Sequence, residues 1–169
     1  MRQLARAALG SALFFAAAPG VVAGLIPYWL TGWRFLNPLP HWAPVRIAGA
    51  LLTLVAALFL VSAFVRFVVE GLGTPAPVAP TQHLVVGGVY RYVRNPMYLA
   101  VIAAIAGQAL LFGQLGLLAY AVIAGLTMFG FVKAYEEPYL ADRYGAEYDE
   151  YRRAVPGWWP RLTPWNRDR

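Results

Sequence analysis

The sequence contains no cysteine, and this absence removes several classes of chemistry. Disulfide frameworks, thiolate nucleophiles, cysteine-ligated zinc and iron–sulfur clusters are all excluded. Histidine is scarce too, because His41 and His83 are the only two. A histidine-based metal site or a Ser-His-Asp triad within one chain is therefore not expected. The motifs G-x-G-x-x-G and H-E-x-x-H are also absent, so neither a soluble nucleotide-binding fold nor a zinc protease site is predicted.

Charged residues make up only 13% of the 169 residues, whereas apolar residues make up 60% and the mean hydropathy is +0.53. This composition is far from that of soluble domains and predicts an integral membrane protein. The net charge is +6, which by itself would also suit nucleic acid. However, the basic residues flank apolar segments, a pattern typical of arginines that meet lipid head groups. We therefore expect membrane lipids, and no nucleic acid, as partners.

The first apolar stretch runs from about residue 7 to residue 30, behind two arginines. Its basic start and an alanine run would also fit a signal peptide. The stretch nevertheless continues to Tyr28 and Trp29, so it is long enough to cross a bilayer and ends in interfacial aromatics. We predict a transmembrane helix, bent at Pro19 and Gly20.

Three further apolar runs follow, at residues 45–69, 97–112 and 115–134. The run 97–112 is short, since roughly sixteen helical residues cover about 24 Å of a hydrocarbon core about 30 Å thick. A glycine-containing turn separates it from the last run, so these two segments are expected to form a tight helical hairpin. The pattern predicts a single all-α integral membrane domain, residues 1–169, with about four transmembrane helices.

Basic residues are distributed unevenly between the two sides of this arrangement. Arg34 and Arg46 fall on one side, and the other twelve of the fourteen fall on the opposite side. The positive-inside rule then places both termini and the loop 71–95 in the cytoplasm. Residues 136–169 combine charge with Tyr and Trp, which predicts an interfacial helix followed by an aromatic anchor.

The segment 82–98 ends in the pattern of a helix start. Asn95 is a good N-cap, and Pro96 suits the first helical position. Free backbone N–H groups beside Arg94 would favour an anionic ligand there. From these local features alone, the simpler interpretation is favoured, in which Asn95 only caps the helix and Arg94 contacts lipid phosphate.

The segment 133–156 begins with a second polar cluster at the exit of the last apolar run. Glu136 and Glu137 are adjacent, and Pro138 follows them. Such a pair can cap the next helix, and alone this is again the simpler interpretation. The pair can equally hold a cationic or polyhydroxyl ligand.

Taken together, the two segments resemble the isoprenylcysteine carboxyl methyltransferases and phospholipid methyltransferases, a superfamily of membrane enzymes. The resemblance covers roughly residues 82–160 and rests on the motifs Leu84-Val85-x-x-Gly88-x-Tyr90, Arg94-x-Pro96-x-Tyr98, Glu136-Glu137-x-x-Leu140 and Tyr144-Gly145-x-Glu147-Tyr148-x-x-Tyr151-Arg152-Arg153-x-Val155-Pro156. Many relatives have histidine where this chain has Asn95. Asparagine cannot carry a proton, so only a hydrogen-bonding role is expected at that position.

The resemblance implies an S-adenosylmethionine-dependent methyltransferase whose lipophilic acceptor reaches a cytoplasmic pocket from the bilayer. It implies that the cofactor is bound by Gln82, Leu84, Val85, Gly88, Tyr90, Arg94, Asn95, Pro96, Tyr98, Glu136 and Glu137. If the acceptor is a carboxylate, Lys133 could orient it, and if the acceptor is an amine, a carboxylate could instead remove its proton, so no catalytic residue is singled out. No metal is expected. Two alternatives are an NADPH-dependent membrane reductase of the sterol-reductase type and a non-catalytic lipid-binding membrane protein.

Overall fold

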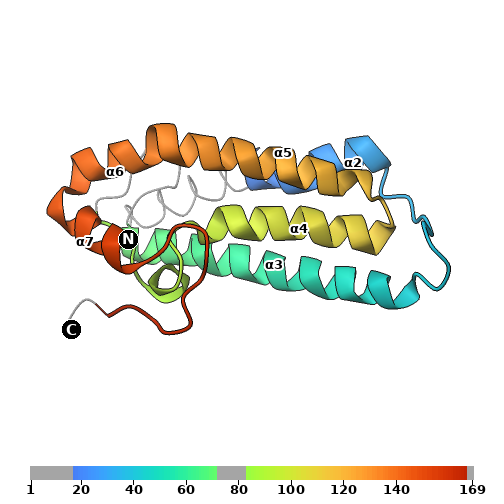
Figure 1. Ribbon diagram of the computed structural model, residues 1–169, viewed down its shortest axis with the longest axis horizontal. Helices are drawn as coiled ribbons and strands as arrows, with labels where there is room; N and C mark the ends of the chain where they lie inside the picture. The colour runs from blue at the N-terminus through green and yellow to red at the C-terminus, as the bar shows by residue number, and fades with distance from the viewer. Residues whose placement is uncertain (1–16, 72–82, 167–169) are drawn as a thin grey trace.

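The computed structural model describes residues 17–71 and 83–166, and every regular element in these ranges is helical (Figure 1). The all-α prediction is therefore confirmed for the described residues. In chain order the elements are the π-helix η1 (Val21–Leu25), α2 (Ile26–Thr31), α3 (Ala43–Gly71), the 3-10 helix η2 (Gly88–Arg91), α4 (Pro96–Phe112), α5 (Gly116–Phe131), the π-helix η3 (Val132–Glu136), α6 (Glu137–Tyr144) and α7 (Ala146–Ala154).

Helix α4 lies in the centre of the bundle, with α3 on one side and α5 on another (Figure 1). Half of its eight buried residues are alanine or glycine, which lets the neighbouring backbones approach. The two backbones come close to each other at Gly49 of α3 and Gly107 of α4. A Cβ atom on Gly107 would collide with Thr53, because the backbone nitrogen of Thr53 would lie only 2.8 Å from that Cβ. Glycine at this crossing permits the tight pairing of α3 with α4.

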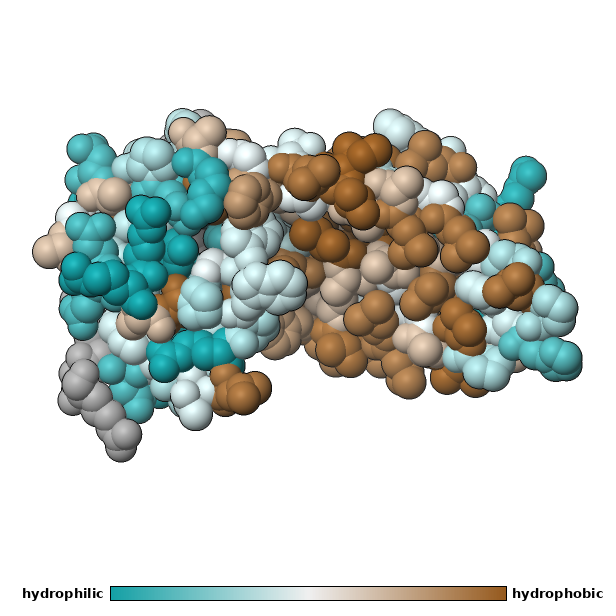
Figure 2. Space-filling view, viewed as in Figure 1, coloured by the Kyte–Doolittle hydropathy of each residue, from teal (hydrophilic) through white to brown (hydrophobic). Residues whose placement is uncertain are grey.

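The outside of the bundle carries a broad apolar band between two polar ends (Figure 2). On α3, for example, Leu51, Leu58 and Val65 are 52–63% exposed. Apolar exposure along whole helices is expected for a surface in contact with lipid and not for a soluble monomer. The chain is accordingly a membrane protein.

Two helices in the described residues, Ala43–Arg66 and Gly116–Tyr144, are long and apolar enough to cross a bilayer, and Val21–Thr31 and Pro96–Phe112 are shorter apolar helices. The start of the first predicted span, residues 7–16, lies outside the described residues. Helix α4 begins one residue before the predicted range and ends at the predicted Phe112. Gly113 then adopts a left-handed conformation, with φ +68°, and closes the helix.

The last apolar helix does not end near residue 134 as predicted. It continues from α5 through η3 into α6, as one helix of 29 residues, Gly116–Tyr144. A helix of that length measures about 43 Å. This exceeds the hydrocarbon thickness of about 30 Å, so its final turns reach beyond the apolar layer. The predicted interfacial helix is thus divided between α6 and α7, which meet at Gly145.

After α7 the chain folds back across the loop that precedes α4 (Figure 1). We name residues 155–165 the strap. Backbone hydrogen bonds join Arg94 N–H to Pro156 O at 3.0 Å, Asn95 N–H to Gly157 O at 3.2 Å and Arg161 N–H to Tyr92 O at 2.9 Å. The strap is thereby fixed against the beginning of α4.

Candidate functional site

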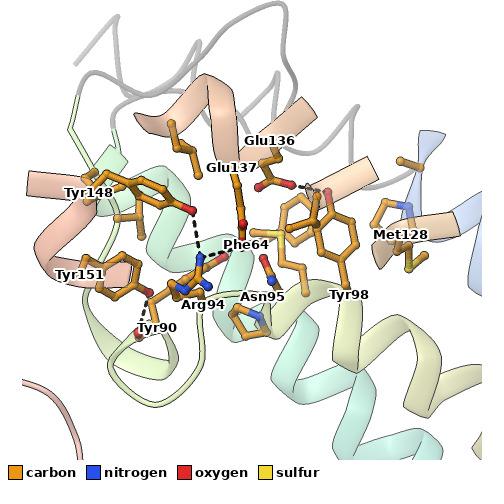
Figure 3. Close-up of a pocket in the computed structure, with 18 of the residues that line it drawn as sticks. Phe64, Tyr90, Arg94, Asn95, Tyr98, Met128, Glu136, Glu137, Tyr148 and Tyr151 are labelled. Carbon is orange, nitrogen blue, oxygen red and sulfur yellow. Dashed lines mark hydrogen bonds and ion pairs between the residues drawn. The ribbon is translucent and has the colours of Figure 1, made fainter. Parts of the chain in front are cut away.

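A pocket opens at the polar end of the bundle, where the start of α4 faces the junction of α5, η3 and α6 (Figure 3). The space inside it, including its open mouth, is about 1040 Å³. Nine of the residues implied by the resemblance line it: Leu84, Val85, Tyr90, Arg94, Asn95, Pro96, Tyr98, Glu136 and Glu137. Sequence segments about 40 residues apart are therefore brought to one cavity.

Three predicted residues are not part of this lining. Gln82 lies outside the described residues. Gly88 begins η2 with φ +55°, and a Cβ there would lie 2.7 Å from Arg66 Nε, so its place in the structure is in a tight turn. Lys133 points to Glu137 and binds both carboxylate oxygens, at 3.1 and 2.9 Å.

Glu137 is the buried centre of an ionic network that reaches the surface. Its side chain is 5% exposed and accepts from Arg94 Nη1 at 3.1 Å and Lys133 Nζ at 2.9 Å, while Arg152 Nη2 lies 3.3 Å away. Burial alone would raise the pKa of Glu137. The hydrogen bond from Lys133 and the charges of Arg94, Lys133 and Arg152 outweigh burial and lower the pKa. Glu137 is thus held ionised by the protein itself.

Arg94 is also committed to protein groups. Its Nη1 donates to the Tyr148 hydroxyl at 2.9 Å as well as to Glu137, and its Nε donates to Val155 O at 2.9 Å. These bonds connect the α4 start to α6, α7 and the strap. The arrangement makes Arg94 a link between the elements that enclose the pocket.

Glu136 has a different environment from its neighbour. One carboxylate oxygen, Oε2, accepts from the Tyr98 hydroxyl at 2.8 Å, and the side chain lies in the pocket wall (Figure 3). Burial raises the pKa of Glu136, the hydrogen bond from Tyr98 partly offsets this, and the nearby charge of Glu137 adds to the increase. No cation is bonded to Glu136 in the described part of the chain. The carboxylate is therefore the acidic group best placed to meet a ligand.

Glu136 and Glu137 meet different partners although they are adjacent. Successive residues of a helix point about 100° apart, because one turn holds 3.6 residues. The π-helix η3 ends at Glu136, immediately before Glu137, and π-helical turns are frequent at functional sites. Glu137 reaches Arg94, while Glu136 reaches Tyr98 on α4.

The N-terminus of α4 is less open than the sequence suggested. Asn95 is the N-cap residue, but its side chain makes no capping hydrogen bond. The N–H groups of Arg94 and Asn95 are both taken by the strap. The side-chain Nδ2 of Asn95 is buried and has no hydrogen-bond partner among the described residues. This amide is a donor that an acceptor on a ligand would satisfy.

One wall of the pocket could not be found from sequence motifs. The first helical segment contributes Ala18, Pro19 and Val22, and Met128 faces them from α5. These residues belong to no recognisable pattern beyond apolarity. The segment is fixed by hydrogen bonds from Tyr120 OH to Val22 O, 2.9 Å, and from Gln108 Nε2 to Ala23 O, 2.6 Å. The pocket therefore combines a polar side with an apolar side.

An α-helical membrane protein with a ligand-sized pocket at one polar end is the class that this fold and site define. A model of the phospholipid methyltransferase family matches residues 45–147, more than half of the chain. The chain belongs to that family, and the predicted resemblance is confirmed. It is a membrane methyltransferase. No curated protein and no solved structure matched the sequence.

The matched range includes all of α3 except its first two residues, α4, α5 and both glutamates, but it stops before Tyr148. Tyr148 and Tyr151 nevertheless line the pocket. Tyr151 donates to Tyr90 O at 2.7 Å, so it also holds the loop before α4. The sequence placed both tyrosines in a family-like motif but did not single them out as site residues.

Proposed function

We propose that this protein transfers the methyl group of S-adenosylmethionine to a hydrophobic or lipid-like acceptor, at the cytoplasmic face of the membrane. The family supplies the reaction class. The observation that carries the proposal is Glu136, a partly buried carboxylate without a cationic partner among the described residues, in a pocket with an apolar wall. A cationic, polyhydroxylated cofactor and a lipophilic acceptor match these two sides.

The polar side of the pocket fits the cofactor. Glu136 can accept hydrogen bonds from ribose hydroxyls or from the ammonium group, because its Oε1 is not bonded to the neighbouring cations. The unpartnered Asn95 amide suits a carboxylate oxygen. The rings of Tyr90 and Tyr98 stand beside these groups, where an aromatic face favours the positive charge of a sulfonium.

The apolar side of the pocket fits the acceptor. Val22, Met97 and Met128 line it close to the lipid-facing part of the bundle. Methionine side chains adapt to irregular hydrocarbon shapes. Lys133 lies outside the lining and binds Glu137, so to orient an anionic group of the acceptor its side chain, which is 44% exposed, would have to leave that carboxylate.

S-adenosylmethionine supplies a carbon that is already activated by its sulfonium. The residues of this chain then need chiefly to align the acceptor and exclude water. Arg94, Tyr148 and Glu137 fix the elements around the pocket, and Glu136 with Tyr98 fixes the cofactor. The topology predicted from the basic residues would put the polar end of the bundle on the cytosolic side, within reach of cytosolic S-adenosylmethionine.

Titration of the purified protein with S-adenosylhomocysteine and with NADPH tests the proposal. We expect saturable binding of S-adenosylhomocysteine and none of NADPH. A second assay measures transfer of a labelled methyl group from S-adenosylmethionine into lipid extracts, and we expect labelled lipid. Binding of NADPH alone would instead favour the reductase alternative, and binding of neither would favour a non-catalytic role.

A further inference from the structure

The strap places Trp158 against Tyr98, the tyrosine whose hydroxyl donates to Glu136. The rings of Trp158 and Tyr98 are stacked, with centroids 6.2 Å apart and planes 27° apart. On its other side Trp158 contacts Phe129 of α5, with centroids 5.5 Å apart. Trp158 is therefore wedged between the start of α4 and the polar end of α5.

Ring packing, and not a hydrogen bond, holds the indole in this place. Its Nε1–H is buried and has no acceptor within the described residues. The backbone on the N-terminal side of Trp158 is fixed, because Pro156 O and Gly157 O accept from Arg94 and Asn95. A side chain with the same flat apolar surface should therefore replace Trp158 at little cost, whereas a small one should not.

We propose that Trp158 is a positioning residue for the pocket: it presses the Tyr98 ring into the orientation in which its hydroxyl donates to Glu136. This goes beyond the family match, which ends at residue 147. Trp158 does not line the pocket and acts through Tyr98. Without the indole, Tyr98 gains room to rotate, and the Glu136 carboxylate loses the donor that fixes its direction.

The neighbouring tryptophan provides a matched control. Trp159 is 81% exposed and is also in the strap, but no ring contact joins it to another described aromatic residue. The variants Trp158→Ala and Trp159→Ala therefore remove the same side chain from adjacent positions. Only the first is expected to disturb Tyr98.

The effect on ligand binding rests on the proposed function. We expect Trp158→Ala to weaken S-adenosylhomocysteine binding about tenfold, the effect of losing one aromatic pair and the order it imposes. Trp158→Phe should retain most of the affinity, and Trp159→Ala should retain all of it. In a Tyr98→Phe background, which lacks the hydroxyl, Trp158→Ala should have little further effect on affinity. Equal losses in both backgrounds would overturn the proposal, because they would indicate a general structural role.

A second measurement is independent of any ligand. Tyr98 is replaced by 3-fluorotyrosine in the full chain, and the fluorine resonance is recorded in the wild type and in both alanine variants. Trp158→Ala should shift and broaden the signal, and Trp159→Ala should leave it unchanged. An unmoved signal in Trp158→Ala would overturn the positioning role even in a folded protein. If the wild type does not bind S-adenosylhomocysteine, the proposed function fails, and the fluorine signal still decides the role of Trp158.

Discussion

Glu137 binds Arg94 at 3.1 Å across the pocket, whereas Glu136, the preceding residue, is bonded to Tyr98 at 2.8 Å. One carboxylate is surrounded by cations of the protein, and the other faces the cavity with a single phenolic donor. Neutralising Glu136 should therefore affect mainly ligand binding, whereas neutralising Glu137 should affect mainly stability.

We expect Glu136→Gln to weaken S-adenosylhomocysteine binding by about 1.5–3 kcal/mol, since a charge-assisted hydrogen bond is lost, without lowering stability. Glu137→Gln should lower the apparent Tm clearly, because it leaves the buried Arg94 without its counter-charge, at a cost of about 3 kcal/mol. Calorimetric titration and thermal unfolding in detergent measure both effects. Identical behaviour of the two variants would contradict the division of roles.

The raised pKa of Glu136 predicts opposite pH dependences for stability and binding. A carboxyl whose pKa is higher in the folded than in the unfolded state binds its proton more tightly when folded. The contribution of Glu136 to stability is thus present at low pH and is lost as pH rises through its folded-state pKa. Cofactor binding needs the ionised form, so affinity should increase over the same range. Glu136→Gln should remove this part of both profiles, and an unchanged pH profile of affinity in the variant would exclude Glu136 as the group responsible.

Arg94→Lys keeps the charge but cannot reproduce the guanidinium contacts. Arg94 donates to Glu137, Tyr148 and Val155 through two nitrogens, and a single ammonium cannot reach all three. We expect the free energy of unfolding to fall by about 2 kcal/mol and the affinity for S-adenosylhomocysteine to fall with it. Arg153→Lys, at an exposed position, is the control. Wild-type stability and affinity in Arg94→Lys would mean that Arg94 needs only its charge.

The crossing of α3 and α4 can be tested with alanine. In Gly107→Ala the new methyl group would meet Thr53, so we expect a loss of about 1–3 kcal/mol from overpacking. Gly130→Ala is the control, because nothing lies within 4 Å of its Cβ position, and alanine there should be neutral or slightly stabilising. Apparent Tm values of both variants in detergent give the comparison. Equal Tm values would argue against the close helix contact.

The predicted orientation places both termini and the loop 71–95 in the cytoplasm. Reporter fusions at each end, one active only in the cytoplasm and one only outside it, measure this directly. We expect cytoplasmic activity at both ends. An external C-terminus would place the pocket away from cytosolic S-adenosylmethionine, and the proposed function would fail with the topology.

The sequence was sufficient for the parts of the fold that depend on apolar runs. The ranges 45–69 and 97–112 lie close to α3 and α4, because an uninterrupted apolar run and a glycine stop are local signals. The prediction that the last helix ends near residue 134 was wrong. The apolar run ends there, but the π-helix η3 continues the helix into polar sequence, and nothing in the composition indicates this.

The candidate site was predictable as a set of residues but not as a set of contacts. The family-like motifs placed Tyr98 and Glu136 in one site. They did not indicate that Glu136 and Glu137 would have separate partners, because that depends on the direction of each side chain after η3. Trp158 was also missed as a neighbour of Tyr98, since 60 residues separate them in the sequence and only the folded strap joins them.

The strap also has a consequence for how the protein is made. The helices that cross the membrane leave the ribosome before residues 155–165 do, and segments of a nascent chain begin to fold as they emerge. Until the strap emerges, the N–H groups of Arg94 and Asn95 lack their acceptors in the strap, and the Tyr98 ring lacks its contact with Trp158. The helices around the pocket are therefore made before the segment that fixes the start of α4, and the complete site forms only after the strap has left the ribosome.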